Sequence, residues 1–362
     1  MRSYYASLQG ARGFAAIAVL LYHVWQMAKD NLGRSFAGGW FSQGSHGVDF
    51  FFVLSGFIIL HANREDIGVP SAAPRYFYRR LVRIYPILIL LTVLKLAYMI
   101  VGGAGIPDHK RALSYILCST MLVPLPEFPF LSVSWTLCFE MFFYGTFLLC
   151  VLYGTRIRWW MAGHAAGILV FNLPWLPPLE YPASFFFSPY ILDFYLGCIT
   201  AFLCAHRLVP PTLAWVCVAV GGLLSALCVG AHDHLLPLFN SLVPLCWGLS
   251  FFFVITGIAA LEQNGRLRVP RPLAYLGDAS YSIYLVHNNI ILAGGVLIAK
   301  RLSAVGNFLS PVLFCLATVT LLVSLAFYHY VERPMLRWLQ HRGPRPPEMT
   351  RPPPSELALA AP

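Results

Sequence analysis

The sequence predicts an all-α polytopic membrane protein, and the composition and the length of the apolar runs are the grounds for this prediction. Hydrophobic residues make up 58% of the 362 residues and charged residues only 11%, whereas a soluble domain usually has about 25% charged residues. Apolar runs of about 20 residues, which can cross a bilayer as a helix, follow one another along most of the chain. The chain therefore has room for about ten spans with short connections.

Ten runs have a length and composition suited to membrane helices. They are residues 12–29, 46–62, 82–101, 132–153, 159–177, 186–205, 212–229, 242–261, 280–299 and 309–331. An eleventh run, residues 112–123, is too short to cross and is followed directly by Pro124, Pro126 and Pro129. We expect residues 112–131 to form a re-entrant or interfacial segment.

The distribution of Lys and Arg predicts the orientation, because the cytoplasmic loops of membrane proteins carry an excess of both. With ten spans, one side carries 18 Lys and Arg residues and the other side six. The prediction is a multi-pass protein of the inner (cell) membrane, with both termini in the cytoplasm and residues 112–131 at the outer face.

The net charge of +10 follows from this topology, so no nucleic-acid partner is expected. The nine cysteines lie in or beside apolar runs without a C-x-x-C pair, which indicates neither a disulfide framework nor a zinc site. We assign residues 1–340 to one transmembrane domain. Residues 341–362 are rich in proline and are expected to be a disordered cytoplasmic tail.

The first span contains two ionisable side chains, Arg12 near its start and His23 deep inside. Eleven residues at about 100° each make about three turns, so the two side chains share a helix face about 16 Å apart. An ionisable residue inside an apolar span is costly, which indicates a functional site. His23 is the candidate proton-transfer group, because imidazole gains and loses a proton near neutral pH.

Three arginines, Arg79, Arg80 and Arg83, stand together in RYFYRRLVRIYP at the start of the third span. At spacings of three and four residues, at least two of them share a helix face. Guanidinium forks bind phosphate oxygens in pairs, so the cluster suits a di- or polyphosphate ligand. Membrane topology and contacts with anionic lipid are the alternative explanation.

Three carboxylates lie within predicted spans: Asp49 in the second, Glu140 in SVSWTLCFEMFFY (residues 132–144) and Asp193 in the sixth. Glu140 lies about 12 Å below the outer surface and His23 lies near mid-membrane, so the two side chains can meet. A buried carboxylate is seldom without a partner, and His23 is the natural partner for Glu140, Asp49 or Asp193. Asp49 has a second interpretation, as an acid that complements the dipole at a helix start.

The segment LGDASYSIYLVHNNI, residues 276–290, places Tyr281, Tyr284 and His287 at intervals of three on one side of a helix. A lone histidine in an apolar helix is more often a packing residue. Two tyrosines on the same side favour a functional role for His287.

These segments together resemble the integral-membrane acyltransferase-3 family from residue 7 to about residue 340. The matching motifs are Arg12 to His23, GVDFFFVLSGF, R-x-x-R-I-Y-P from Arg80 to Pro86, SWTLCFE, LGDASYSIYLVH, and E-R-P from Glu332 to Pro334. Each motif is weak alone, but the set in family order is specific. Ala11 and Thr136 depart from the family pattern, in which Leu and Ser are common.

The resemblance implies about ten spans and transfer of an acyl group, usually acetyl, from cytoplasmic acyl-CoA to hydroxyls of glycans, lipid-linked sugars or macrolides. It implies that His23 is the catalytic histidine, that Arg12 is its motif partner, and that Arg80 and Arg83 bind the donor. Acyl-CoA is then a co-substrate, and neither a bound cofactor nor a metal is expected.

The resulting hypothesis is O-acetylation of an exopolysaccharide or lipopolysaccharide, with His23 oriented by Glu140 or Asp49 as the general base. A transporter or flippase of a sugar substrate, using the buried charges as a proton path, is the alternative. The acceptor, the acyl group, the oligomeric state and the choice between direct transfer and an acyl-enzyme stay open.

Overall fold

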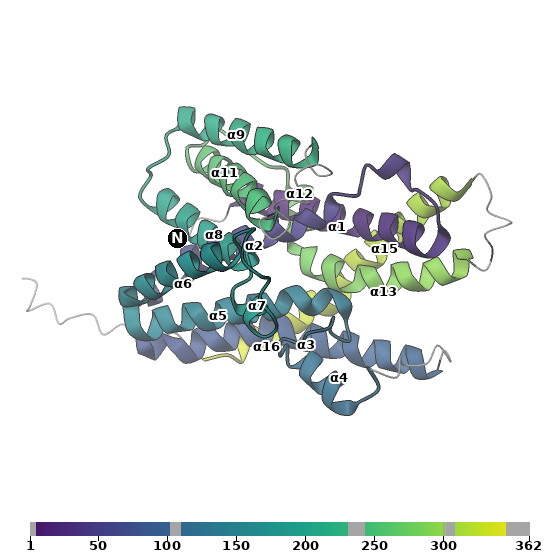
Figure 1. Cartoon of the computed structure of the whole chain (residues 1–362). Coiled ribbons are helices and arrows are strands. Elements are labelled where there is room, and N and C mark those ends of the chain that lie inside the picture. The colour runs from purple at the N-terminus through teal and green to yellow at the C-terminus, as the bar shows by residue number, and fades with distance from the viewer. Residues whose placement is uncertain (1–4, 102–109, 231–242, 300, 302–307, 345–362) are drawn as a thin grey trace, which may run out of the picture.

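The computed structural model of the protein describes residues 5–101, 110–230, 243–299, 301 and 308–344. All regular elements in these residues are helical, which confirms the predicted all-α fold. Figure 1 shows α1, α13 and α15 running alongside one another, and α3 alongside α5. The α-helices are α1 (Ala6–Leu32), α2 (Gly47–Asn63), α3 (Ala73–Val101), α4 (Leu113–Thr120), α5 (Trp135–Tyr153), α6 (Ile157–Phe171), α7 (Ala183–Phe186), α8 (Tyr190–Ala205), α9 (Pro211–Gly230), α11 (Val243–Gln263), α12 (Arg271–Asp278), α13 (Ser280–Ala299), α15 (Leu309–Phe327) and α16 (Arg333–His341).

Eight helical segments of the described chain are long and apolar enough to cross a membrane. They are Gly44–Asp66, Pro70–Val101, Ser132–Phe171, Ala183–Ala205, Pro211–Gly230, Val243–Gln263, Ser280–Ala299 and Leu309–His341. Helix α1 is not among them, because Arg12, His23 and Gln26 make it less apolar. Helices α5 and α6 together form one of the eight segments, Ser132–Phe171. The multi-pass fold is confirmed, whereas the count of ten spans and the cytoplasmic termini stay predictions. Most of the predicted tail, residues 345–362, lies outside the described residues.

Some helix ends differ from the predicted spans. Helix α3 begins at Ala73, nine residues before the predicted start at 82, because the arginine-rich segment continues the same helix. Helix α6 ends at Phe171, not at 177, and Pro174 follows soon after. Helix α4 has only eight residues, about 12 Å, which agrees with the prediction that residues 112–123 do not cross.

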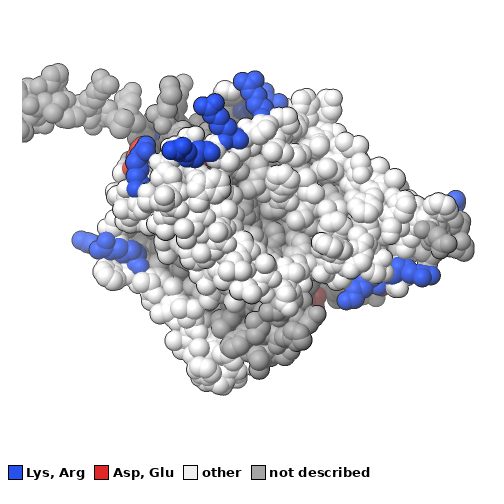
Figure 2. Space-filling view, turned by 90° about the horizontal axis from the view of Figure 1, so that it is seen from above, with Lys and Arg blue, Asp and Glu red and all other residues white. Residues whose placement is uncertain are grey.

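The charged side chains are unevenly distributed over the surface. In Figure 2 the Lys and Arg side chains gather at opposite ends of the visible face, and a broad uncharged area lies between them. This arrangement suits a protein whose middle is surrounded by lipid hydrocarbon, where charge is costly.

Helix α1 is held at its start by a carboxylate from another helix. Glu262 of α11 accepts hydrogen bonds from the backbone N–H groups of Ala6 (2.8 Å) and Ser7 (2.9 Å) and from the Ser7 hydroxyl. These donors have no partner within α1, and the negative charge complements the helix dipole. On its side, α1 packs closely on α12, where a Cβ added to Gly277 would lie 1.8 Å from the Gln9 carbonyl oxygen. The position of α1, and with it Arg12 and His23, is thereby fixed.

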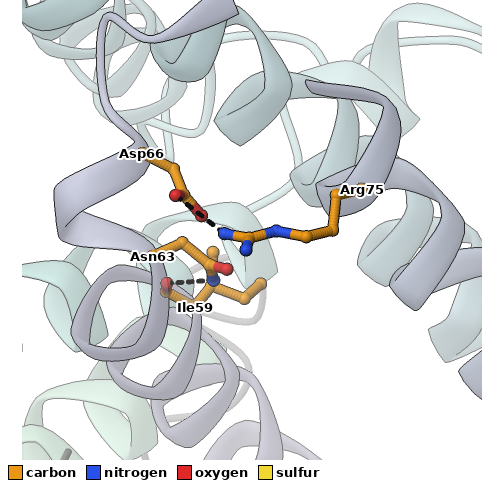
Figure 3. A network of polar contacts seen from close by, with 4 residues as sticks. All are labelled: Ile59, Asn63, Asp66 and Arg75. Atoms are coloured by element: carbon orange, nitrogen blue, oxygen red, sulfur yellow. Dashed lines mark hydrogen bonds and ion pairs between the residues drawn. The ribbon is translucent and has the colours of Figure 1, made fainter. Parts of the chain in front are cut away.

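A polar clamp joins the end of α2 to the start of α3 (Figure 3). Arg75 of α3 donates to Asp66 Oδ1 at 3.2 Å and forms the link, whereas the bond from Asn63 Nδ2 to the Ile59 carbonyl oxygen, 2.7 Å, lies within α2. The clamp sets where α3 begins relative to α2, and therefore where the arginines of α3 lie.

Helices α2 and α8 cross with their backbones in close contact. A Cβ added to Gly197 would lie 1.9 Å from the Val53 carbonyl oxygen, and one added to Gly56 would lie 2.0 Å from the Phe194 carbonyl oxygen. Small residues allow such crossings in membrane proteins. Since the obstacle is backbone, it cannot rotate away.

We expect Gly197→Leu to prevent folding or to lower the free energy of unfolding by about 3 kcal/mol or more, because it overpacks this crossing. The measurement is the thermal transition of the purified protein in detergent. Gly222→Leu in α9 is the matched control, since no atom lies within 4 Å of a Cβ added there. Equal transitions for the two variants would contradict the close crossing.

Candidate active site

Three arginines line a cavity of about 70 Å³ between α1, α2, α3, α5 and α13. Arg12 comes from α1, and Arg80 and Arg83 come from neighbouring turns of α3. Glu140 of α5 is the one carboxylate among the described lining residues, so the lining carries an excess of positive charge. We call this space the arginine cavity. Its charge suits a ligand with more than one negative group.

Arg80 is held by aromatic rings. Its guanidinium carbon lies 5.4 Å from the Tyr76 ring centroid and 5.3 Å from that of Tyr144, which are cation–π distances. The Arg80 Nε is buried and has no hydrogen-bond partner in the described structure. A buried donor without a partner is costly, so this atom is available to a ligand that enters the cavity.

Two carboxylates balance Arg12 and Arg83. Glu140 accepts a hydrogen bond from Tyr144, and Glu332 accepts one from Ser282. Both carboxylates interact electrostatically with Arg12 and with Arg83. Opposite charge thus stabilises Arg12 and Arg83, whereas Arg80 contacts aromatic rings.

Hydroxyl groups complete the wall of the arginine cavity. Tyr281 donates to the Ile84 carbonyl oxygen at 2.9 Å, and Tyr284 donates to the Val133 carbonyl oxygen at 3.0 Å. The hydroxyl of Ser280 is buried and has no partner among the described residues. Tyr284 and Thr136 hydroxyls lie 2.9 Å apart.

His23 and His287 lie against each other. Their ring centroids are 4.9 Å apart, and the His287 ring is 5.9 Å from that of Tyr284. His287 Nδ1 lies 2.9 Å from the Ile283 carbonyl oxygen, which can only accept, so Nδ1 carries a hydrogen. The fully buried Nε2 has no hydrogen-bond partner in the part of the chain described. In the neutral ring this atom is a base next to His23.

On its other side His23 lines a second cavity, of about 270 Å³, with Gln26, Ser132, Trp135 and Asn288. We call it the histidine cavity. Asn288 Nδ2 donates to Ser132 Oγ at 2.8 Å, so the serine hydrogen and the asparagine oxygen stay available to a ligand. Tyr284, His287 and His23 therefore connect the arginine cavity to the histidine cavity through successive ring contacts.

The carboxylates predicted as partners of His23 lie elsewhere. Asp49 Oδ2 is 3.0 Å from His46 Nδ1, and Asp193 is buried near Asp49. Glu140 bonds Tyr144. None of these three carboxylates forms a hydrogen bond or ion pair with His23 in the described structure, so the predicted pairing is not what the structure contains. Asp49 and Glu140 each have a partner close in sequence, whereas both oxygens of Asp193 are buried without a hydrogen-bond partner in the described structure, and His23 has His287 as its neighbour.

The predicted arginine cluster is divided. Arg80 and Arg83 line the arginine cavity, whereas Arg79 is exposed and does not. One residue corresponds to about 100° around a helix, so adjacent residues point in different directions. Arg12, which was predicted to lie on the same membrane face as the arginine cluster, lines the same cavity as Arg80 and Arg83.

Several residues around the site were not among the predicted site residues. Tyr144 lies one helix turn after Glu140, a spacing that predicts contact. Glu332 was noted in the E-R-P motif without a role. Trp135 and Asn288 lie in segments that were singled out but had no role assigned, and Gln26 carried no signal, because polar and aromatic residues are common near membrane surfaces. A group of three His, Cys, Asp or Glu residues able to hold a metal is not found among the described residues.

The fold and the site define a multi-pass helical membrane protein with a buried cationic cavity beside a histidine pair. The family model for the acyltransferase domain of the acyltransferase-3 family matches residues 5–329. The chain belongs to the acyltransferase-3 family, and it is an integral-membrane acyltransferase of the O-acetyltransferase type.

Relatives with known names cover most of the chain. The exopolysaccharide production protein ExoZ of Rhizobium meliloti is 31% identical over 320 residues, which are 83% of this chain and 92% of ExoZ. The acyltransferase MdmB of Streptomyces mycarofaciens is 27% identical, with 93% of each chain covered. The peptidoglycan O-acetyltransferase OatA of Listeria monocytogenes is 26% identical over 80% of this chain and 50% of OatA. No solved structure matches significantly.

Proposed function

We propose that the protein transfers an acyl group, most simply acetyl, from acyl-CoA to a hydroxyl of a glycan or a lipid-linked saccharide. The contact between His23 and His287 is the main observation behind this proposal, because it lies between the cationic cavity and the polar cavity. The names of ExoZ and OatA, which refer to exopolysaccharide production and peptidoglycan O-acetylation, support a saccharide acceptor.

The donor enters from the side of the arginine cavity. Arg80 and Arg83, with Arg12 opposite, bind the phosphate groups of CoA, and the pantetheine arm carries the thioester toward His287 and His23. In the proposed topology this cavity faces the cytoplasm, where acyl-CoA is made.

The acceptor enters from the side of the histidine cavity. His23 removes the proton from the acceptor hydroxyl, and the oxygen attacks the thioester carbonyl carbon. The C–O bond forms, the C–S bond breaks, and the CoA thiolate takes the proton from the His23 imidazolium. His287 contacts the His23 ring, and its Nε2, which carries no hydrogen in the neutral ring, is an acceptor available to an N–H of His23.

The reaction is tested with the full chain in proteoliposomes and acyl-CoA labelled in the acyl group. We expect free CoA to appear only when a saccharide acceptor is present, in a one-to-one ratio with labelled saccharide. A sugar transporter would instead move the saccharide across the membrane without releasing CoA. Saccharide movement with no CoA release would therefore overturn the proposal.

A further inference from the structure

The segment between α4 and α5, residues 121–131, is held by side chains that bond its backbone. Tyr181 donates to the Pro124 carbonyl oxygen at 2.8 Å, and Lys95 donates to that of Phe130 at 2.7 Å. Further bonds run from Tyr85 to Met121, from Lys110 and Tyr115 to Phe128, and from the Phe130 N–H to Ser119. Side chains from several parts of the chain thus fix this loop, which makes it a defined wall and not a loose connection.

Residues of this wall line two neighbouring cavities. A cavity of about 290 Å³, which we call the loop cavity, lies against Pro124, Glu127 and Tyr181. The histidine cavity, of about 270 Å³, lies on the other side of the wall. Phe128 and Trp135 line both cavities, so the two spaces adjoin along these rings and lead to His23.

The combined lining has the chemistry of a saccharide site. Phe128, which is 63% exposed, and Trp135 offer flat apolar faces of the size of a sugar ring. Gln26, Asn31 and Asn288 offer amide groups that both donate and accept hydrogen bonds, as a ring of hydroxyls requires. Binding sites of this kind combine apolar surface with a few placed polar groups.

The charges of the lining favour a neutral saccharide. Asp30 of the histidine cavity and Glu127 of the loop cavity are carboxylates, and no Lys or Arg is among the described residues that line either space. Asp30 disfavours a uronic acid or phosphate on the sugar in the histidine cavity, whereas a neutral hydroxyl can donate to this carboxylate.

We propose that the histidine cavity and the loop cavity form one acceptor groove for a neutral saccharide. The sugar to be acylated occupies the histidine cavity beside His23, and the next sugar stacks on Phe128 and Trp135 in the loop cavity. This inference rests on the proposed function for the identity of the acceptor, but the groove itself can be tested without acyl transfer.

The test measures the binding of oligosaccharides to the full chain in lipid nanodiscs without acyl-CoA. Tryptophan fluorescence is the readout of binding. We expect saturable binding of maltotetraose and about tenfold weaker binding of tetragalacturonate, which has the same length and carries carboxylates. Phe128→Ala should raise the dissociation constant for maltotetraose about fivefold or more. Asn31→Ala should also raise the dissociation constant for maltotetraose. Because Asn31 is exposed, this variant replaces Phe128→Ala if Phe128→Ala fails to fold.

Phe308→Ala is the matched control, because Phe308 is 72% exposed and lies outside both cavities. It should leave maltotetraose binding unchanged. Asp30→Asn should reduce the difference between the two oligosaccharides. Equal binding of the two oligosaccharides by the wild type, or an unchanged dissociation constant in both Phe128→Ala and Asn31→Ala, would overturn the proposal.

The groove and the acyl transfer fail in distinguishable ways. A protein that binds maltotetraose through Phe128 but never releases CoA would support the groove and contradict the proposed function. A protein that acylates saccharides with an acceptor KM unchanged by Phe128→Ala would support the function and overturn the groove. Absence of saturable binding of maltotetraose would also overturn the proposed saccharide groove. Membrane lipid would then be the occupant of the two cavities.

Discussion

His23→Ala abolishes acyl transfer, with an expected fall in kcat of at least about 100-fold, the lower range for loss of a general base. His23 is the one imidazole among the described residues that both contacts His287 and lines the histidine cavity. No described carboxylate bonds His23, so a neighbouring acid is not positioned to replace it. The measurement is labelled acyl transfer by the purified protein at saturating acyl-CoA.

The control for this experiment is His206→Ala, which removes an exposed histidine outside the three cavities. Both variants should elute as single species and keep the wild-type thermal transition within about 3 °C, since neither removes a large buried side chain. A His23→Ala protein that keeps more than half of the wild-type rate would sink the assignment. Loss of the folded species in His23→Ala alone would mean that the ring is structural.

The sequence was a good guide to the fold because bilayer thickness limits how long an apolar run must be. The predicted runs coincide with helices from α2 to α15, apart from shifts at their ends. The shift at α3 has a physical cause, since Arg75, Arg79 and Arg80 lower apolarity without disfavouring a helix. Hydropathy therefore detects where a helix enters the bilayer and not where it begins.

The sequence was a weaker guide to the partners of each side chain. The period of the helix brings Arg12 and His23 to one face, but it does not say which other helix packs there. Charge alone suggested a carboxylate beside His23. The structure pairs Asp49 with His46 and Glu140 with Tyr144, each about one turn away on or beside its own helix. The contact with His287 joins opposite ends of the chain, and only tertiary packing brings it about.

Arg80→Ala raises the KM for acyl-CoA by about tenfold to a hundredfold, as expected for a lost charged hydrogen bond of about 1.5–3 kcal/mol. Arg80 lines the arginine cavity, its guanidinium lies at cation–π distance from the rings of Tyr76 and Tyr144, and its Nε is without a partner in the described structure. The KM for the saccharide acceptor should stay within about twofold, because the acceptor groove lies on the other side of the histidine pair. Initial rates over a range of acyl-CoA concentrations measure both constants.

Arg79→Ala is a matched control, because it removes the same side chain and the same charge one residue earlier on α3. Arg79 is exposed and does not line the arginine cavity, so its loss should change the KM for acyl-CoA by less than about twofold. If the positive charge of α3 served only topology or anionic lipid, the two variants would behave alike. Arg80→Lys separates charge from shape: it keeps the charge but loses the planar fork that stacks on Tyr76 and Tyr144, so its KM should lie between those of the wild type and Arg80→Ala. An effect of Arg80→Ala on the acceptor KM alone would contradict a donor site in the arginine cavity.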